Sequence, residues 1–175
     1  MFKTLSQRLE DYIVKHPYFD IDTVYSKVLE NHKKAIWKLQ HRISDRVQHM
    51  IENQSNVYFL TFTFNDKNLP LNDTQKIKSG NTLHDFMMNN GVSMYVANID
   101  YGKENGRFHW HAVALSENPF SHEFWKMGAV NFKKVPKSSI PLKLTRYLIK
   151  LKRHATKITD PIAIYYPMHY KKVLK

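Results

Sequence analysis

Apolar residues in the first part of the chain recur at spacings of three and four, the pattern of one face of an amphipathic helix. The pattern follows Asp22 and Thr23, which are good N-cap residues, and its members are Tyr25, Val28, Leu29, Ile36, Leu39, Ile43, Val47, Met50 and Ile51. The flanking charges do not form the regular pairs of a coiled coil. We therefore predict that residues 1–56 form a helical extension that packs on a domain spanning residues 57–175.

The remainder of the chain alternates short β-prone runs with short helical ones. Runs rich in β-branched and aromatic residues predict strands at residues 58–64, 93–100, 108–115 and 130–135. Helices are predicted at residues 82–89, 119–127 and 139–155, and an edge strand or a segment lying against the sheet at 162–166. The turn-rich connection at residues 101–107 predicts an antiparallel hairpin. This order indicates an α+β fold, with an antiparallel sheet of about five strands and helices on one face.

Composition and charge narrow the class of partner. The 175 residues are 42% hydrophobic and include no cysteine, so disulfides and thiolate zinc sites are excluded and a cytoplasmic location is expected. No apolar run has the length of a signal peptide core or a membrane span. Residues 126–175 hold thirteen Lys and Arg against Asp160 as their one acid, which equals the net charge of +12. Such a segment favours nucleic acid as the partner, and the alternative is a solvated basic face.

A His-x-His pair in the third predicted strand offers candidate metal ligands. Because strand side chains alternate between faces, His109 and His111 project together and Trp110 projects to the opposite face. In a symmetric hairpin, Asp100 lies opposite His109 and adds a carboxylate on the same face. Two imidazoles and a carboxylate form a common ligand set for a divalent ion. The alternatives are exposed sheet histidines and an aspartate that begins a turn, and one His-x-His among 10 histidines is weak evidence alone.

The basic helix predicted at residues 139–155 carries a candidate nucleophile. Tyr147 lies at the edge of the buried stripe, which consists of Leu144, Leu148 and Leu151. The adjoining flank is lined by Lys143, Lys150 and His154. A tyrosine in this place can keep its ring on the core and expose its hydroxyl, and nearby cations favour the nucleophilic phenolate. The alternative is an ordinary boundary tyrosine, because the spacing Tyr-x-x-Lys also occurs at Tyr12.

An ordered set of short motifs resembles a known family. The motifs are Asp100-Tyr101-Gly102, Gly106-Arg107-Phe108-His109-Trp110-His111, the pair Trp125 and Gly128, and Tyr147-Leu148-Ile149-Lys150. Over about residues 57–152 the chain resembles the HUH-endonuclease replication initiators of small phages and plasmids. The run at residues 59–64 looks like the family motif that is associated with origin recognition. The resemblance implies a ferredoxin- or RRM-like fold and a nicking and joining enzyme of rolling-circle replication.

The resemblance also implies site residues and partners. A Mg²⁺ or Mn²⁺ ion would be held by His109, His111 and Asp100, although the family usually has Glu as the third ligand, which leaves Glu104 as the alternative. Tyr147 would become joined to the 5′ phosphate of the nicked strand, assisted by Lys150. Contacts to DNA are expected from Thr61, Thr63, Arg107, Lys143, Arg146, Arg153 and His154. The DNA would be a single-stranded replication origin in the form of a hairpin. A separate helicase and polymerase are expected, because the chain has no Gly-x-x-x-x-Gly-Lys-Ser/Thr loop.

Three other functions stay open at this point. A related transposase or mobilisation relaxase would share the metal site, and the relaxase would place its nucleophile near the N-terminus, at Tyr12. A non-enzymatic basic protein of ferredoxin-like fold would bind single-stranded DNA without a metal. An iron oxygenase also uses two histidines and a carboxylate, but the basic tail does not suit a small-molecule enzyme.

Overall fold

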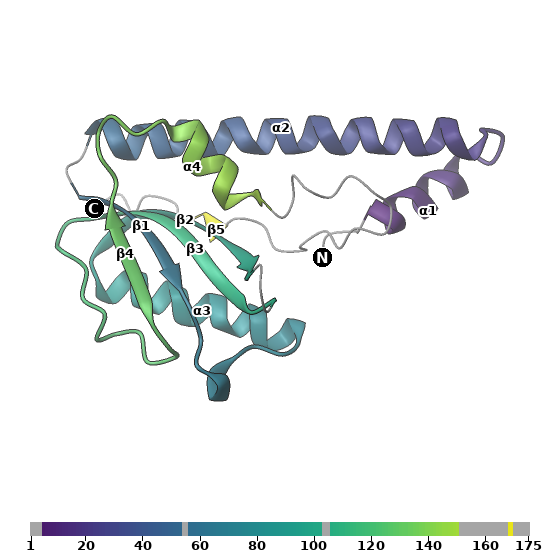
Figure 1. The fold of residues 1–175 in the computed structure, drawn as a ribbon. Coiled ribbons are helices and arrows are strands. Elements are labelled where there is room, and N and C mark those ends of the chain that lie inside the picture. The colour runs from purple at the N-terminus through teal and green to yellow at the C-terminus, as the bar shows by residue number, and fades with distance from the viewer. Residues whose placement is uncertain (1–4, 54–55, 103–105, 151–167, 170–175) are drawn as a thin grey trace.

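An antiparallel sheet lies at the centre of the protein, whose computed structural model describes residues 5–53, 56–102, 106–150 and 168–169. The strand order is β4-β1-β3-β2-β5 (Figure 1). The strands are β1 (Val57–Phe62), β2 (Val92–Tyr101), β3 (Phe108–Ser116), β4 (Val130–Lys134) and the two-residue β5 (Met168–His169). The four longer strands lie within two residues of their predicted bounds. The predicted α+β class with an antiparallel sheet is therefore confirmed.

One face of the sheet is covered by α3 (Asp73–Asn89) (Figure 1). The buried side chains of this layer include Leu60, Phe62, Leu83, Phe86, Met87, Ile99 and Trp110. Trp110 is 2% exposed, and its indole N–H donates to Ser79 Oγ at 3.0 Å. Because this bond satisfies the single polar group of the ring, the indole is buried without an unpaired donor. The prediction that Trp110 faces away from the two histidines is confirmed.

The opposite face is covered by α2 (Ile21–Asn53) and α4 (Pro141–Leu148), so the prediction of helices on one face is wrong. This second face carries apolar strand residues at one end, namely Val57, Val96, Val113 and Leu115. These side chains must be removed from water. The residues that cover them include Ile43, Val47 and Met50 of α2 and Leu148 of α4.

The N-terminal half of α2 extends beyond the sheet and pairs with α1 (Leu5–Lys15) (Figure 1). A small separate cluster of Leu9, Val24 and Val28 holds the two helices together. The cap of α2 is Asp20, rather than Asp22 or Thr23, because its carboxylate accepts hydrogen bonds from the N–H and the hydroxyl of Thr23. The predicted helical extension is therefore a hairpin of two helices, and only the C-terminal half of α2 packs on the sheet.

Two predicted helices differ from the structure. The helix expected at residues 82–89 begins already at Asp73, because Asn72 and Gln75 form a reciprocal capping box before a polar first half. Residues 119–127 form turns and bends instead of the expected helix. Phe120 and Trp125 are both buried against the sheet. Positions 120 and 125 lie on different faces of a helix, so a helix could not bury both rings in one layer.

The C-terminal predictions are only partly covered by the described residues. The helix expected at residues 139–155 is α4, with Pro141 in its first turn as predicted. Its expected continuation from residue 151 lies outside the described residues, as does the segment 162–166. The short β5 pairs with β2 just beyond that segment.

None of the described helices is both long enough and apolar enough to cross a membrane.

The packing of α2 on the sheet gives a first testable prediction. Ile43 is 0% exposed, and Ile77 on α3 is 59% exposed. We expect Ile43→Ala to lower the free energy of unfolding by about 2–5 kcal/mol, because it leaves a cavity under the helix. The matched control Ile77→Ala should cost less than about 0.5 kcal/mol. Urea unfolding measures both, and equal small losses would show that α2 does not form part of the core.

Candidate metal centre

The second face of the sheet changes from apolar to polar along its strands, and the polar end holds the candidate ligands. In the register of β2 and β3, Asp100 lies opposite His109 and Asn98 opposite His111. On the other side of β3, Thr61 of β1 also lies opposite His111. The predicted pairing of Asp100 with His109 is confirmed. Two neighbouring rows of polar residues therefore cross the centre of the sheet.

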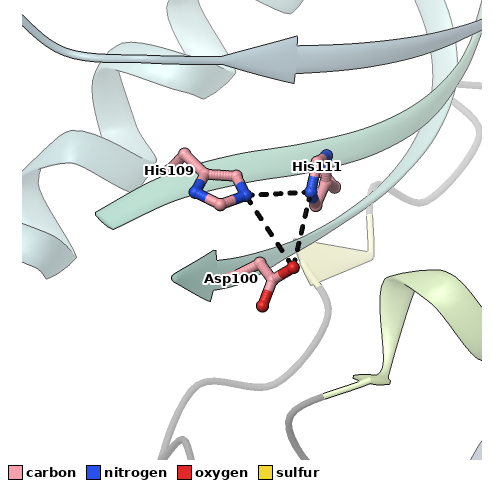
Figure 2. A group of neighbouring side chains, drawn as sticks. All are labelled: Asp100, His109 and His111. Carbon is pink, nitrogen blue, oxygen red and sulfur yellow. Dashed lines mark hydrogen bonds and ion pairs between the residues drawn. The ribbon is translucent and has the colours of Figure 1, made fainter. Parts of the chain in front are cut away.

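Three potential metal-ligand atoms, one each from Asp100, His109 and His111, converge at the polar end of this face (Figure 2). The Nε2 atoms of His109 and His111 are 3.0 Å apart. Asp100 Oδ2 lies 3.8 Å from His109 Nε2 and 3.6 Å from His111 Nε2. Asp100 is 3% exposed and His111 4%, whereas His109 is half-buried at the open side. Asp100 and His111 are therefore enclosed by the protein, and His109 is the most exposed of the three ligand candidates.

Each ligand candidate is oriented by a second hydrogen bond. The Nδ1–H of His109 donates to the carbonyl of Arg107 at 3.0 Å, which leaves the lone pair on Nε2, the atom that faces the other two residues. The Nδ1 of His111 is hydrogen-bonded to the hydroxyl of Thr61 at 3.0 Å. The other oxygen of Asp100 accepts the N–H of Tyr101 at 2.9 Å. Such outer partners fix the ring orientation of metal-binding histidines in proteins.

The electrostatics of the group suit a cation. Burial alone would raise the pKa of the Asp100 carboxyl, but its polar contacts with His111 and Lys150 outweigh burial and hold this pKa well below its usual range. Asp100 is therefore a carboxylate at neutral pH. Burial is also the largest effect on His109, where it lowers the pKa and favours the neutral ring. Neutral imidazoles and a carboxylate are the protonation states that bind metal ions.

The spacing of the three atoms also fits a divalent ion. For metal–ligand bonds of about 2.1 Å in octahedral geometry, adjacent ligand atoms lie about 3.0 Å apart. The two Nε2 atoms already have this separation, and the carboxylate oxygen is less than 1 Å too far from each. A small rotation of the Asp100 side chain would close that difference. Asp100, His109 and His111 could thus hold one metal ion. Three ligands fill half of an octahedral coordination shell, so three positions would remain for water or a substrate.

Lys150, two residues after α4, adds a positive charge to this group. Its Nζ donates to Asp100 Oδ2 at 2.7 Å, the same oxygen that faces both histidines. An ammonium and a divalent ion on one oxygen repel each other. Metal binding and the bond from Lys150 therefore compete for this oxygen.

Tyr147 borders the group from α4. Its ring contacts His111, with ring centroids 4.8 Å apart, and also Phe59 at 5.6 Å. The tyrosine is 47% exposed, so part of the side chain faces solvent while the ring packs against His111. The end of α4 is held in place by Asn98, whose side-chain N–H donates to the carbonyl of Leu148 at 2.8 Å.

The alternative nucleophile, Tyr12, lies elsewhere. It packs in the small cluster between α1 and α2 and contacts the ring of His16, with centroids 4.3 Å apart. In Figure 1 this helix hairpin is set apart from the β2–β3 hairpin that carries the histidines. The structure thus brings Tyr147, and not Tyr12, to the candidate metal centre.

The residues expected to contact DNA have different environments. Lys143 and Arg146 are exposed on α4. Thr63 is exposed but donates its hydroxyl to the carbonyl of Ala129. The guanidinium of Arg107 bonds Asp66 and the carbonyl of Phe64, so Arg107 also ties the β2–β3 turn to the end of β1. Arg153, His154 and the alternative ligand Glu104 lie outside the described residues.

Sequence reasoning missed two residues of the site. Asn98 is 0% exposed and connects the sheet to α4. Asn98 and Asp100 are two residues apart in β2. Because side chains alternate between the two faces of a sheet, the sequence could have placed Asn98 on the same face as Asp100. The ring of Phe59 contacts both Tyr147 and His111, with ring centroids 5.6 and 5.4 Å away. Its place depends on the pairing of β1 with β3, which no local signal gives.

Comparisons with known proteins leave the function open. No protein-family model matches the chain, and no curated protein is significantly similar to it. Among solved structures, the chain is similar to the hypothetical protein ORF119 from Sulfolobus islandicus rod-shaped virus 1, with 18% sequence identity and a TM-score of 0.47. The match covers 65% of this chain and 96% of that chain. A likeness at this level carries no information on activity.

The ligand geometry predicts that a divalent ion stabilises the protein. We expect Mn²⁺ at about 100 times its dissociation constant to add about 2.7 kcal/mol to the free energy of unfolding. His109→Ala should lose most of this gain, whereas His41→Ala, at an exposed histidine of α2, should keep it. Thermal unfolding with Mn²⁺ and with EDTA measures the effect. An equal gain in the His109→Ala protein would place the ion at another site.

The shared oxygen of Asp100 gives a prediction for Lys150. Because the ammonium competes with the ion for this oxygen, we expect Lys150→Met to bind Mn²⁺ more tightly than the unchanged protein. Lys143→Met, at an exposed lysine of α4, should leave the affinity unchanged. Calorimetric titration with Mn²⁺ measures both variants. Weaker binding in Lys150→Met would mean that the lysine supports the ion by orienting the carboxylate.

Proposed function

We propose that the protein is a metal-dependent, single-tyrosine endonuclease that nicks and rejoins single-stranded DNA. One observation carries the proposal: the ring of Tyr147 lies against His111, one of three converging ligand candidates. Lys150, three residues after Tyr147 in the sequence, donates to the third ligand candidate, Asp100. The proposed nucleophile is thus next to a cation and a candidate ion site, an arrangement that can support phosphoryl transfer to tyrosine.

The proposed reaction starts with a phosphodiester placed between the ion site and Tyr147. A bound Mg²⁺ or Mn²⁺ would polarise the scissile phosphate as a Lewis acid. The hydroxyl oxygen of Tyr147 attacks phosphorus and forms the new O–P bond, and its proton passes to solvent through the exposed part of the side chain. The P–O3′ bond breaks, and its electron pair stays on O3′, which takes up a proton as a 3′ hydroxyl. The product is a 5′-phosphotyrosine and a free 3′ end.

The residues around Tyr147 each have a role in this step. Lys150 moves from Asp100 toward the phosphate and stabilises the negative charge that builds up on its oxygens. The ring of His109, whose pKa is lowered by burial, is held by the carbonyl of Arg107. The ring of His111 is held by the hydroxyl of Thr61. The phosphotyrosine keeps the energy of the broken ester, so a later 3′ hydroxyl can reverse the step without ATP. We propose initiation of rolling-circle replication as its use, with unwinding supplied by a separate helicase.

The position of Tyr12 favours this assignment over a relaxase. A nucleophile near the N-terminus would have to approach His109 and His111, and Tyr12 instead packs between α1 and α2. The metal geometry also disfavours a purely non-enzymatic DNA-binding protein, which has no need of three converging ligands with oriented rings.

Covalent capture tests the proposal. We expect the protein to form an adduct with members of a pool of single-stranded oligonucleotides in Mn²⁺, and Tyr147→Phe to form none, because the variant lacks the attacking oxygen. Tyr12→Phe is the matched control and should react like the unchanged protein. Denaturing gels and mass spectrometry of the adducted peptide provide the measurement. An adduct on Tyr147→Phe contradicts the assignment, and DNA binding that is indifferent to EDTA, without any adduct, indicates a non-enzymatic binder.

A further inference from the structure

A groove of about 480 Å³ lies beside Tyr147, on the side of α4 that faces β4. Its apolar walls come from Phe59, Val135, Leu144 and Tyr147. Its basic residues are Lys133, Lys134 and Lys143, all three of which are exposed. Among the described residues that line the groove, none is acidic. An apolar interior with a cationic rim is suited to a ligand that is both aromatic and anionic.

The lysines stand next to the rings for simple geometric reasons. Lys133 of β4 lies directly opposite Phe59 of β1 in the antiparallel register, and side chains at such positions are neighbours on one face. Lys143 and Tyr147 are four residues apart on α4, so they also lie side by side. Each of the two rings therefore has an ammonium group within reach. A base stacked on a ring would have its phosphates close to these ammonium groups.

The groove is continuous with the candidate metal centre. The rings of Phe59 and Tyr147 both line the groove, and both contact the ring of His111, with centroids 5.4 and 4.8 Å away. These two aromatic side chains therefore border both the groove and the candidate metal centre. A volume of about 480 Å³ lies within the range of small-ligand sites, about 300–1,000 Å³. It is enough for one nucleotide and too small for a folded partner.

We propose that this groove binds one nucleotide of single-stranded DNA, next to the phosphate that lies at the metal centre. The inference rests on the proposed function, because it takes single-stranded DNA as the partner. The base stacks on Phe59 and Tyr147, and Lys133 and Lys143 bind the phosphates of the same strand. Stacking on aromatic rings tolerates every base, so the groove holds the strand in position without reading its sequence.

Equilibrium binding of a fluorescein-labelled oligothymidylate in EDTA tests the groove apart from the chemistry. Phe59→Leu removes the stacking ring and should weaken binding about 5- to 100-fold, the loss expected for one stacked base. The double variant Lys133→Glu, Lys143→Glu should also weaken binding and lower the salt dependence, by about 0.7 in log–log slope for each phosphate that the protein no longer neutralises. The matched control is Lys27→Glu, Lys78→Glu, at exposed lysines of α2 and α3, and it should keep the slope.

The outcomes separate the groove from the proposed nuclease. If the unchanged protein forms an adduct with oligonucleotides but the groove variants bind oligothymidylate like the control, the groove inference is overturned and the nuclease stands. If the groove variants lose affinity and salt dependence but no adduct forms with any oligonucleotide, the nuclease proposal falls and the groove stands. Thermal unfolding shows whether the Phe59→Leu protein is folded. If it is not, binding of oligothymidylate by the double variant Lys133→Glu, Lys143→Glu tests the groove inference by itself.

Discussion

The pairing of β2 with β3 in one register is the constraint that places every part of the candidate centre. Side chains alternate along a strand, so a slip of one residue would send either Asp100 or the two histidines to the α3-covered face. The register is fixed from the other side of the sheet, where Trp110 and Ile99 are buried opposite each other beneath α3. The apolar packing of one face thus determines the polar chemistry of the other.

The second face of the sheet has an apolar region and a polar region, because the residue types on that face change along the strands. Its apolar end, with Val96 and Val113, is covered by α2 and α4, whereas its polar end includes the half-buried His109. Tyr147 lies at the boundary between the two ends. This position explains how one helical segment can bury Leu148 in the core and still bring the ring of Tyr147 and the ammonium group of Lys150 to a polar centre. The bond from Asn98 to the end of α4 joins the two regions.

Local patterns in the sequence predicted the strands, the hairpin and the meeting of Asp100 with His109, since alternation and turn residues act over short distances. They did not predict that helices cover both faces, because the partner of an apolar strand face is chosen by tertiary packing. The turn structure around Phe120 and Trp125 was missed for the same reason: two buried rings outweigh helix propensity. Asn98 could have been assigned to the site from the sequence, because it lies two residues before Asp100 in one strand. Phe59 could not, because its place beside His111 depends on the pairing of β1 with β3.

The proposed chemistry depends on Asp100, His109 and His111 holding one divalent ion beside Tyr147. Anomalous X-ray diffraction from crystals grown with Mn²⁺ tests this most directly. We expect one strong anomalous peak within about 2.2 Å of both Nε2 atoms and of a carboxylate oxygen of Asp100, with the Tyr147 ring next to it. A Mn²⁺ peak at other residues, or a well-ordered centre that shows none at saturating Mn²⁺, would contradict this assignment.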